Sequence, residues 1–404
     1  MGRYDKLLLL VTVLLVMLGA LMIYSCTSIV TPVFAKKGVT EFYYFKRHLF
    51  TILIGFSVML LAYRLKPSFL KKNALPLLIF SFVLLILVFL PGIGVSAGGA
   101  RRWIQLWPST FQPSELVKLS MVIFLARYMS MPDYRADSIV SFAKPILIMG
   151  VFQAAILKQP DFGAAMSLAV LTGSMLFLSG VKLRFLASLA VFAVPVVVKL
   201  AMEPYRLKRI ISFLNPWDDA QGSGFQLVQS FIALGSGGIT GIGIGNSRQK
   251  LSYLPESHTD FIFSIIGEEF GFIGVTVVLV LFLILFVKGI SVAARAEDSF
   301  IRYLATGLSL MISFQALINF AVATGLVPTK GLPLPFISYG GSSLLVNMAA
   351  VGILLNISKG EHTEEIINDR ELLMKRRARR RITEEKRRTG AAGRIYPDRL
   401  PAPR

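Results

Sequence analysis

The chain contains ten apolar runs, and this feature limits the available folds more than any other. Each run is close to the length of about 20 residues that crosses a bilayer as a helix. Inside lipid the backbone polar groups must be hydrogen-bonded within the segment, and no run alternates as a barrel strand does. We therefore predict an all-α polytopic membrane protein with about ten transmembrane helices. The runs cover about residues 7–25, 48–64, 74–92, 114–130, 143–158, 162–180, 185–202, 261–288, 300–326 and 339–357.

Lysine and arginine set the expected orientation of these helices. An even number of spans places both termini on one side, and basic residues at Arg3, Lys6 and between 64 and 72 mark that side as the cytoplasm. Residues 1–358 are expected to form the membrane domain. The tail 359–404, which contains KRRARRR, is expected to be a flexible cytoplasmic segment. We interpret its charge as a topology signal that contacts anionic membrane lipid, and not as a nucleic-acid site.

The loops assigned to the outer face are also basic, and the positive-inside rule does not explain this charge. Two alternatives remain open. These side chains contact anionic lipid of the outer leaflet, or they bind an anionic substrate such as a lipid phosphate. The residues are Lys36, Lys37, Lys46, Arg47, Arg101, Arg102, Arg206, Lys208, Arg209, Arg248, Lys250 and Lys330.

One outer loop, about residues 203–260, is much longer than the others and precedes the eighth predicted helix. Long ordered loops are often functional. Its segment GSGGITGIGIGNSRQK is rich in glycine, but no strand precedes it and it lacks the GK[ST] of a phosphate loop. We interpret it as a packed turn region or a re-entrant piece at the membrane surface. The single cysteine, Cys26, and the three scattered histidines specify neither a disulfide nor a zinc site.

Charged residues occur where helices enter the membrane. Glu115 and Lys118 are three apart in QPSELVKLSM, so they share a helical face and can form an ion pair. Such a pair either locks helix packing or forms the polar floor of a substrate cavity. Asp161 in KQPDFG is typical of a turn or a helix N-cap. Glu268 and Glu269 are adjacent and cannot share a helical face, so at least one should point into the bundle.

Asp260 stands in LPESHTDFIF, directly before a long apolar run. Ser257 and Asp260 have the spacing of a capping box, and an acid in the first turn complements the helix dipole. On spacing alone this capping role is favoured over a chemical one. The later segment TGLVPTKGLPLPFISYGGSSLLVN carries Lys330 and Ser338. Its glycines and serines favour close helix packing, with exposure of backbone N–H groups to an anion as the alternative.

Several long motifs resemble the SEDS family, the polytopic peptidoglycan polymerases of shape, elongation, division and sporulation. The resemblance extends over about residues 5–358 and leaves out the basic tail. It is closer to the division member than to the elongation member, and the sporulation member is similar in the same motifs. The motifs are GARRWIQL, QPSELVKLS, KQPDFG, GIGNSRQKLSYLPESHTDFIFSIIGEEFG and TGLVPTKGLPLPFISYGGSSLL.

The resemblance implies polymerisation of lipid II by glycosyl transfer at the outer face of the cytoplasmic membrane during cell division. Asp260 matches the essential aspartate of the family and is expected to act as the general base, with undecaprenyl diphosphate as the leaving group. Arg101 or Arg102, with Lys330, are candidates for stabilising the diphosphate, and Mg²⁺ or Mn²⁺ can assist them. Further residues at motif or family polar positions are expected near the substrate: Arg47, Gln112, Glu115, Lys118, Asp161 and Ser338.

The resemblance also implies partners, namely a class B penicillin-binding protein whose transpeptidase crosslinks the glycan, and other proteins of the divisome. Two alternatives to the enzyme remain. A lipid II flippase would use a buried polar cavity but has no evident use for a fixed outer carboxylate. A non-catalytic divisome scaffold would tolerate Asp260→Asn.

Overall fold

The computed structural model describes residues 4–27, 43–97, 100–106, 109–250, 254, 258–329 and 331–360. Within these ranges the chain forms helices joined by short loops, with one small sheet. The helices are α1 (Lys6–Thr27), α3 (Tyr43–Arg64), α4 (Pro67–Leu87), α5 (Pro113–Met129), α6 (Ile139–Lys158), α7 (Phe162–Leu178), α8 (Leu183–Ala201), α9 (Pro204–Leu214), α10 (Phe225–Ser236), α11 (Ile262–Ala294), α12 (Ser299–Ala323) and α13 (Gly341–Ile357). The strands are β1 (Gly94–Ala97), β2 (Ala100–Leu106) and β3 (Ser109–Phe111).

Each of the ten predicted apolar runs contains a helix. Among the described residues, seven helices are long and apolar enough to cross a membrane: α1, α3, α4, α6, α8, α11 and α12. The apolar helices α7 and α13 are slightly shorter, with 17 residues each. Helix α5 also has 17 residues and carries the charged pair Glu115 and Lys118. The prediction of a mainly helical, polytopic membrane chain is therefore confirmed.

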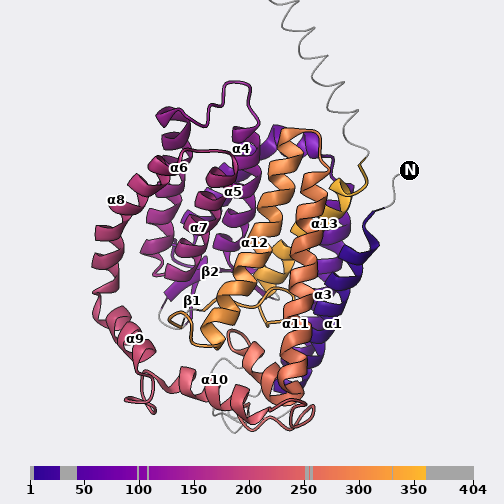
Figure 1. The fold of residues 1–404 in the computed structure, drawn as a ribbon, viewed down its shortest axis with the longest axis vertical. Coiled ribbons are helices and arrows are strands. Elements are labelled where there is room, and N and C mark those ends of the chain that lie inside the picture. Colours follow the sequence, from indigo (N-terminus) through magenta and orange to yellow (C-terminus); the bar gives the residue numbers. More distant parts are fainter. Residues whose placement is uncertain are drawn as a thin grey trace, which may run out of the picture.

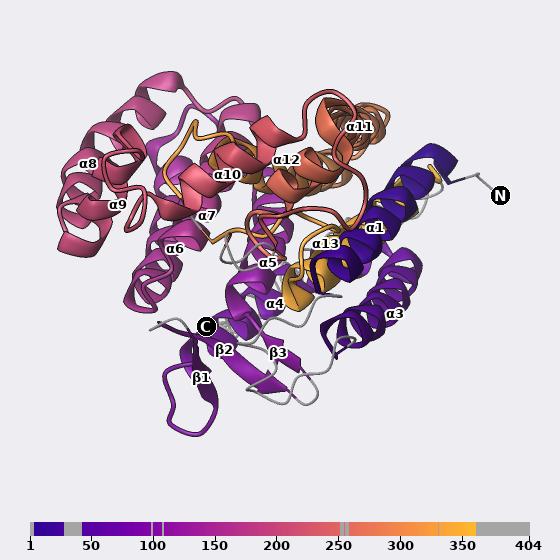
Figure 2. The same cartoon turned by 90° about the horizontal axis from the view of Figure 1, so that it is seen from below.

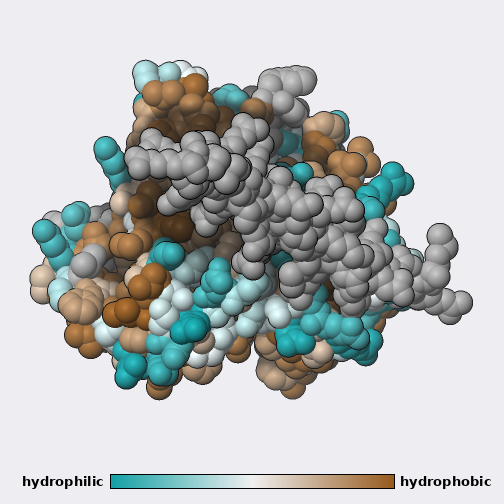
Figure 3. Space-filling model, turned by 90° about the horizontal axis from the view of Figure 1, so that it is seen from above, coloured by the Kyte–Doolittle hydropathy of each residue, from teal (hydrophilic) through white to brown (hydrophobic). Residues whose placement is uncertain are grey.

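The helices pack as a bundle whose two ends differ (Figures 1 and 2). Helix α3 packs on α13 and α11 on α12, while α5 contacts both α4 and α12. The first and last described segments lie together at one end, where the Asp5 backbone N–H donates to Ser358 Oγ at 3.0 Å. Hydrophilic residues are exposed on this end (Figure 3). Helices α8, α9 and α10 form an arc that leaves the bundle and returns along the opposite end.

The prediction of an exclusively helical chain is wrong between residues 94 and 111. Here β1, β2 and β3 form an antiparallel sheet in sequence order. Strand β2 pairs Ile104 with Gly94 on one side and with Phe111 on the other. This segment lies between α4 and α5 and is too short and polar for a span. Its backbone groups are hydrogen-bonded across strands instead of along a helix.

The long loop between α8 and α11 contains two helices and then folds back on α11. Among its residues with described burial, helix α9 is half exposed, whereas α10 contacts α11. After α10, the glycine-rich segment places the backbone N–H groups of Ile242 and Gly243 on the carbonyls of Glu268 and Glu269. These bonds are possible because α11 is interrupted at Gly271, with φ 66° and ψ −161°. A Cβ at this position would lie 2.4 Å from the Gly241 nitrogen, so only glycine fits.

Both adjacent acids of α11 are buried next to this interruption. Glu269 pairs with Lys250 at 2.9 Å and accepts from Ser25 of α1. Glu268 accepts from Ser247 Oγ and from the Arg248 backbone N–H. The sequence predicted that at least one of the two acids points into the bundle, because adjacent residues do not share a helical face; both are buried. The folded-back loop covers the second one.

The Lys250–Glu269 pair gives a test of how this loop is anchored. Both side chains are at most 1% exposed. We expect Glu269→Gln to lower the free energy of unfolding by about 3–5 kcal/mol, because it leaves a buried ammonium without its counter-charge. The double variant Lys250→Met/Glu269→Leu should recover most of that loss. Thermal unfolding of the detergent-solubilised protein measures both.

The control is Lys208→Met, which removes the exposed Lys208–Asp219 pair of the same loop. It should leave the unfolding midpoint nearly unchanged. Equal losses from Glu269→Gln and Lys208→Met would contradict the anchoring role.

Candidate functional site

Asp260 lies in the turn that leads into α11, and it is half-buried. The helix begins at Ile262, with Phe261 at the N-cap position and no side-chain cap bond there. Asp260 therefore precedes the helix and does not lie in its first turn, where the capping interpretation placed it, and Ser257 lies outside the described residues. A Cβ built on Gly331 would stand 3.1 Å from Asp260 Oδ2, so the carboxylate faces the segment that follows α12.

The turn that carries Asp260 is held by the segment before α13. Ser338 Oγ donates to the Thr259 carbonyl at 2.5 Å and accepts from the Leu334 backbone N–H at 2.8 Å. The Tyr339 backbone N–H donates to the His258 carbonyl at 2.9 Å. Ser338, expected near the substrate, thus connects two loops that are almost 80 residues apart in the sequence.

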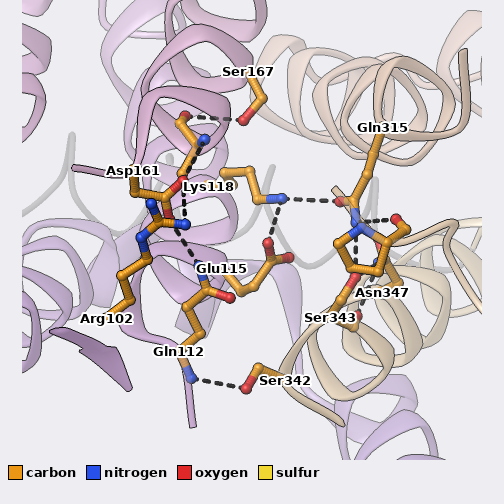
Figure 4. A network of polar contacts seen from close by, with 12 residues as sticks. Arg102, Gln112, Glu115, Lys118, Asp161, Ser167, Gln315, Ser342, Ser343 and Asn347 are labelled. Carbon is orange, nitrogen blue, oxygen red and sulfur yellow. Dashed lines mark hydrogen bonds and ion pairs between the residues drawn. The ribbon is translucent and has the colours of Figure 1, made fainter. Parts of the chain in front are cut away.

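Arg102, Gln112 and Asp161 are brought together from β2, the start of α5 and the start of α7 (Figure 4). Asp161 caps α7 by accepting from the Ala164 backbone N–H at 3.1 Å, as its turn motif predicted. Its second oxygen accepts from Gln112 Nε2 at 2.8 Å, and Arg102 Nη1 lies 4.0 Å from the carboxylate. Arg102 also donates to the two backbone carbonyls just before Asp161. The Asp161 carboxylate therefore both caps α7 and holds the cluster together.

One predicted residue, Arg101, does not join this cluster. Arg101 is exposed, because successive side chains of β2 point to opposite faces. Lys330 lies outside the described residues, although its neighbour Gly331 is next to Asp260.

Glu115 and Lys118 form the predicted ion pair, with 2.8 Å between Lys118 Nζ and Glu115 Oε1. Both residues are only 3% exposed. Lys118 also donates to Gln315 Oε1 at 2.9 Å, and Gln315 in turn donates to Ser343 Oγ and to the Pro333 carbonyl (Figure 4). The pair therefore connects α5, α12 and α13. This arrangement favours a role in helix packing over the floor of a substrate cavity.

A pocket of about 220 Å³ lies between α3, the sheet and the start of α13. Arg47 and Gln112 line it, as does Tyr339, whereas Glu115 and Lys118 are not among its lining residues. Burial raises the pKa of the Tyr339 phenol to about 12, although the nearby Arg47 guanidinium acts in the opposite direction. This phenol is therefore neutral at physiological pH and available as a hydrogen-bond donor.

The same pocket contains the start of α13. Gly340, Gly341, Ser342 and Ser343 line it, and the N-cap residue Gly340 makes no side-chain cap bond. The N-terminal backbone N–H groups of a helix attract anions when no side chain caps them. With Arg47 beside them, they make this pocket suited to a phosphate group.

No three His, Cys, Asp or Glu side chains of the described residues come together as a metal site.

Sequence reasoning missed Gln315 and Asn319, two buried amides on α12 that contact the loop around Pro333. The sequence does contain a pattern that could have indicated these two residues. Both lie in the apolar run SFQALINF, four residues apart, and polar groups in a membrane span are costly unless they have a partner.

The Asp161 cluster yields a stability prediction. Asp161→Asn keeps an oxygen that can cap α7, whereas Asp161→Ala removes the cap and leaves the Gln112 amide without its acceptor. We expect Asp161→Ala to lose about 1 kcal/mol from the cap and about 1–3 kcal/mol from the unpaired amide, and Asp161→Asn to lose clearly less. Thermal unfolding in detergent compares them, and equal midpoints for the two variants would refute the capping role.

The comparisons agree on one family. The model of the cell cycle protein family FtsW/RodA/SpoVE matches residues 5–363. A probable peptidoglycan glycosyltransferase FtsW of Geobacter sp. (strain M18) is 45% identical, and the match covers 88% of this chain and 96% of that protein. Stage V sporulation protein E of Bacillus subtilis (strain 168) is 40% identical over 88% of this chain and 97% of its own length.

Solved structures give the same result. A chain from a peptidoglycan synthase complex that coordinates polymerization and crosslinking aligns with a TM-score of 0.72 and 29% identity, covering 89% of this chain and 99% of that one. The rod shape determining protein RodA of Thermus thermophilus aligns with a TM-score of 0.65 and 27% identity, covering 89% and 98%. The chain therefore belongs to the FtsW/RodA/SpoVE family of cell cycle proteins, the SEDS family.

Proposed function

We propose that the chain is a peptidoglycan glycosyltransferase that polymerises lipid II into glycan strands during cell division. The observation that carries this proposal is the half-buried Asp260 carboxylate, fixed between the start of α11 and the segment before α13. The printed names of the FtsW relatives support the same activity.

The finer topology is part of this proposal. All ten predicted runs cross the membrane, with both termini in the cytoplasm and Asp260 at the outer face. The bond between Asp5 and Ser358 supports it, because it joins the two described ends. Near those ends, Lys288 pairs with Asp5 and Lys359 lies 3.9 Å from the Tyr63 ring, so positive charge gathers there. The basic tail after residue 359 would then contact anionic lipid of the inner leaflet.

In the proposed reaction, the 4-hydroxyl of one lipid-linked sugar attacks the anomeric carbon of another. A carbon–oxygen bond forms as the bond to the diphosphate breaks, and the configuration changes from α to β. Asp260 accepts the hydroxyl proton in the transition state, and undecaprenyl diphosphate leaves with the bonding electrons. A carboxylate fixed by its own backbone in a partly dry site suits this role, since a positioned base contributes about 10²–10⁴-fold to such a step.

We propose that the pocket beside α13 receives a diphosphate of the lipid substrates. Arg47 supplies a full charge there, and the Tyr339 phenol and the uncapped helix start supply donors. Gln112 lines the same pocket while bonded to Asp161, so the Arg102 cluster forms its supporting wall. Arg101 and Lys330 remain candidates for the leaving group.

We further propose a class B penicillin-binding transpeptidase and other divisome proteins as partners, at the division septum. A similar solved chain belongs to a complex that couples polymerization to crosslinking, which supports a crosslinking partner. The flippase alternative relies on Glu115 and Lys118 as cavity groups, yet Lys118 is paired with Glu115 and bonded to Gln315, and neither residue of the pair lines the pocket.

The decisive experiment is glycan polymerisation from purified lipid II by the protein co-purified with its transpeptidase, with crosslinking blocked. Asp260→Asn should lower the rate at least about 10²-fold, because it removes the base without changing its size. The matched control is Asp219→Asn, an exposed acid of the same long loop, which should polymerise at the wild-type rate.

Equal polymerisation by wild type and Asp260→Asn would exclude Asp260 as the base. Lipid II transfer across vesicle membranes without polymerisation by either protein would favour the flippase.

A further inference from the structure

Asn319 of α12 joins the two segments that meet at the proposed catalytic carboxylate. Its side chain is buried, with 1% of the residue exposed. Its Nδ2 donates to the Asp260 carbonyl at 2.8 Å and to the Leu332 carbonyl at 2.8 Å. One amide nitrogen therefore connects the residue that carries the base to the segment that follows Lys330.

The chemistry of the amide allows only this arrangement. The nitrogen has two N–H donors and uses both on carbonyl oxygens, while Asn319 Oδ1 has no hydrogen-bond partner in the described part of the chain. Turning the amide over would place its oxygen against two other oxygens. A buried acceptor without a partner is costly, so this side chain favours the two carbonyl bonds at the expense of its own oxygen.

Gln315 lies one helical turn earlier and contacts the same loop. Its Nε2 donates to the Pro333 carbonyl at 2.9 Å, directly after the carbonyl that Asn319 holds, and to Ser343 Oγ at 2.8 Å. Lys118 occupies its Oε1, which fixes the orientation of the amide (Figure 4). The successive carbonyls of Leu332 and Pro333 are thus both bonded to side chains of α12. Of the two amides, Asn319 is the one that also bonds the Asp260 carbonyl.

We propose that Asn319 is a positioning residue for glycosyl transfer, which fixes the Asp260 carboxylate relative to the segment of Gly331 and Leu332. The inference rests on the proposed function of Asp260. Asn319 touches no reacting atom and acts through the backbone of Asp260. The tolerance is small, since a Cβ built on Gly331 would lie only 3.1 Å from Asp260 Oδ2. A displacement of about 1 Å at a reacting group can cost about 10²-fold in rate.

The chain offers a matched control for the experiment. Asn356 of α13 is also buried, donates its Nδ2 to a backbone carbonyl, that of Tyr63, and has an Oδ1 without a partner in the described residues. It lies near the bundle end where the described termini meet, because Ser358, two residues later, bonds Asp5. A loss of folding stability alone should be similar for Asn319→Ala and Asn356→Ala.

The test is lipid II polymerisation by the complex with the transpeptidase, with kcat, KM, the pH–rate profile and the unfolding midpoint recorded for each variant. We expect Asn319→Ala to lower kcat about 10–100-fold with KM within about threefold, and to shift the acidic limb of the profile that reports Asp260. Asn356→Ala should keep the wild-type kcat and profile at a similar midpoint. Asn319→Asp is isosteric but places a carboxylate oxygen against the two carbonyls, so it should lower kcat as well. It replaces the alanine variant in the test if that variant does not fold.

Wild-type kcat and an unmoved acidic limb in a folded Asn319 variant would overturn the proposal, as would equal kcat losses in Asn319→Ala and Asn356→Ala. Asp260→Asn in the same assay distinguishes failure of the positioning role of Asn319 from failure of the proposed base, Asp260. If Asp260→Asn is inactive and the Asn319 variants are normal, only the positioning role fails. If Asp260→Asn is fully active, the proposed base fails, whatever Asn319 does.

Discussion

Irregular backbone that enters a membrane bundle must find its hydrogen bonds inside the protein, and this requirement organises the part of the molecule around Asp260. The turn before α11 and the segment before α13 are both non-helical, and both carry carbonyls that a helix would otherwise satisfy. Side chains of the neighbouring helix and loop supply the missing donors. Asn319, Gln315 and Ser338 each donate to such a carbonyl. The loops are consequently fixed relative to the helices rather than free above them.

Buried charge follows the same logic. Lys118 and Lys250 are each enclosed, and each has a carboxylate within 2.9 Å. A buried charge without such a partner would be expensive, and a pair with further hydrogen bonds is tolerated. Lys118 donates a further hydrogen bond to Gln315, and Lys250 donates one to Ser25. One pair therefore stabilises the contact between α5 and α12, and the other fastens the long loop to α1 and α11.

The pocket beside α13 differs from these interior networks because its groups are not all paired with one another. It collects Arg47, the Tyr339 phenol and the start of an uncapped helix at one place. Interior pairs such as Glu115 with Lys118 hold the walls, while the pocket keeps donors for a ligand. In the proposed function, this division leaves the pocket groups free to bind the diphosphate of a lipid substrate while the interior pairs support its walls.

Sequence periodicity and length determined the helical membrane architecture, since a run of apolar residues has few other solutions in lipid. The pairing of Glu115 with Lys118 and the cap at Asp161 also followed from local spacing. The small sheet was missed because short paired strands have no periodic signal of membrane length. Spacing could not show that Asp260 stands before the N-cap, nor that Gly331 and Asn319 lie beside it. Those neighbours come from segments about 60 to 70 residues away in the sequence, so only the packing of α11 against α12 could decide them.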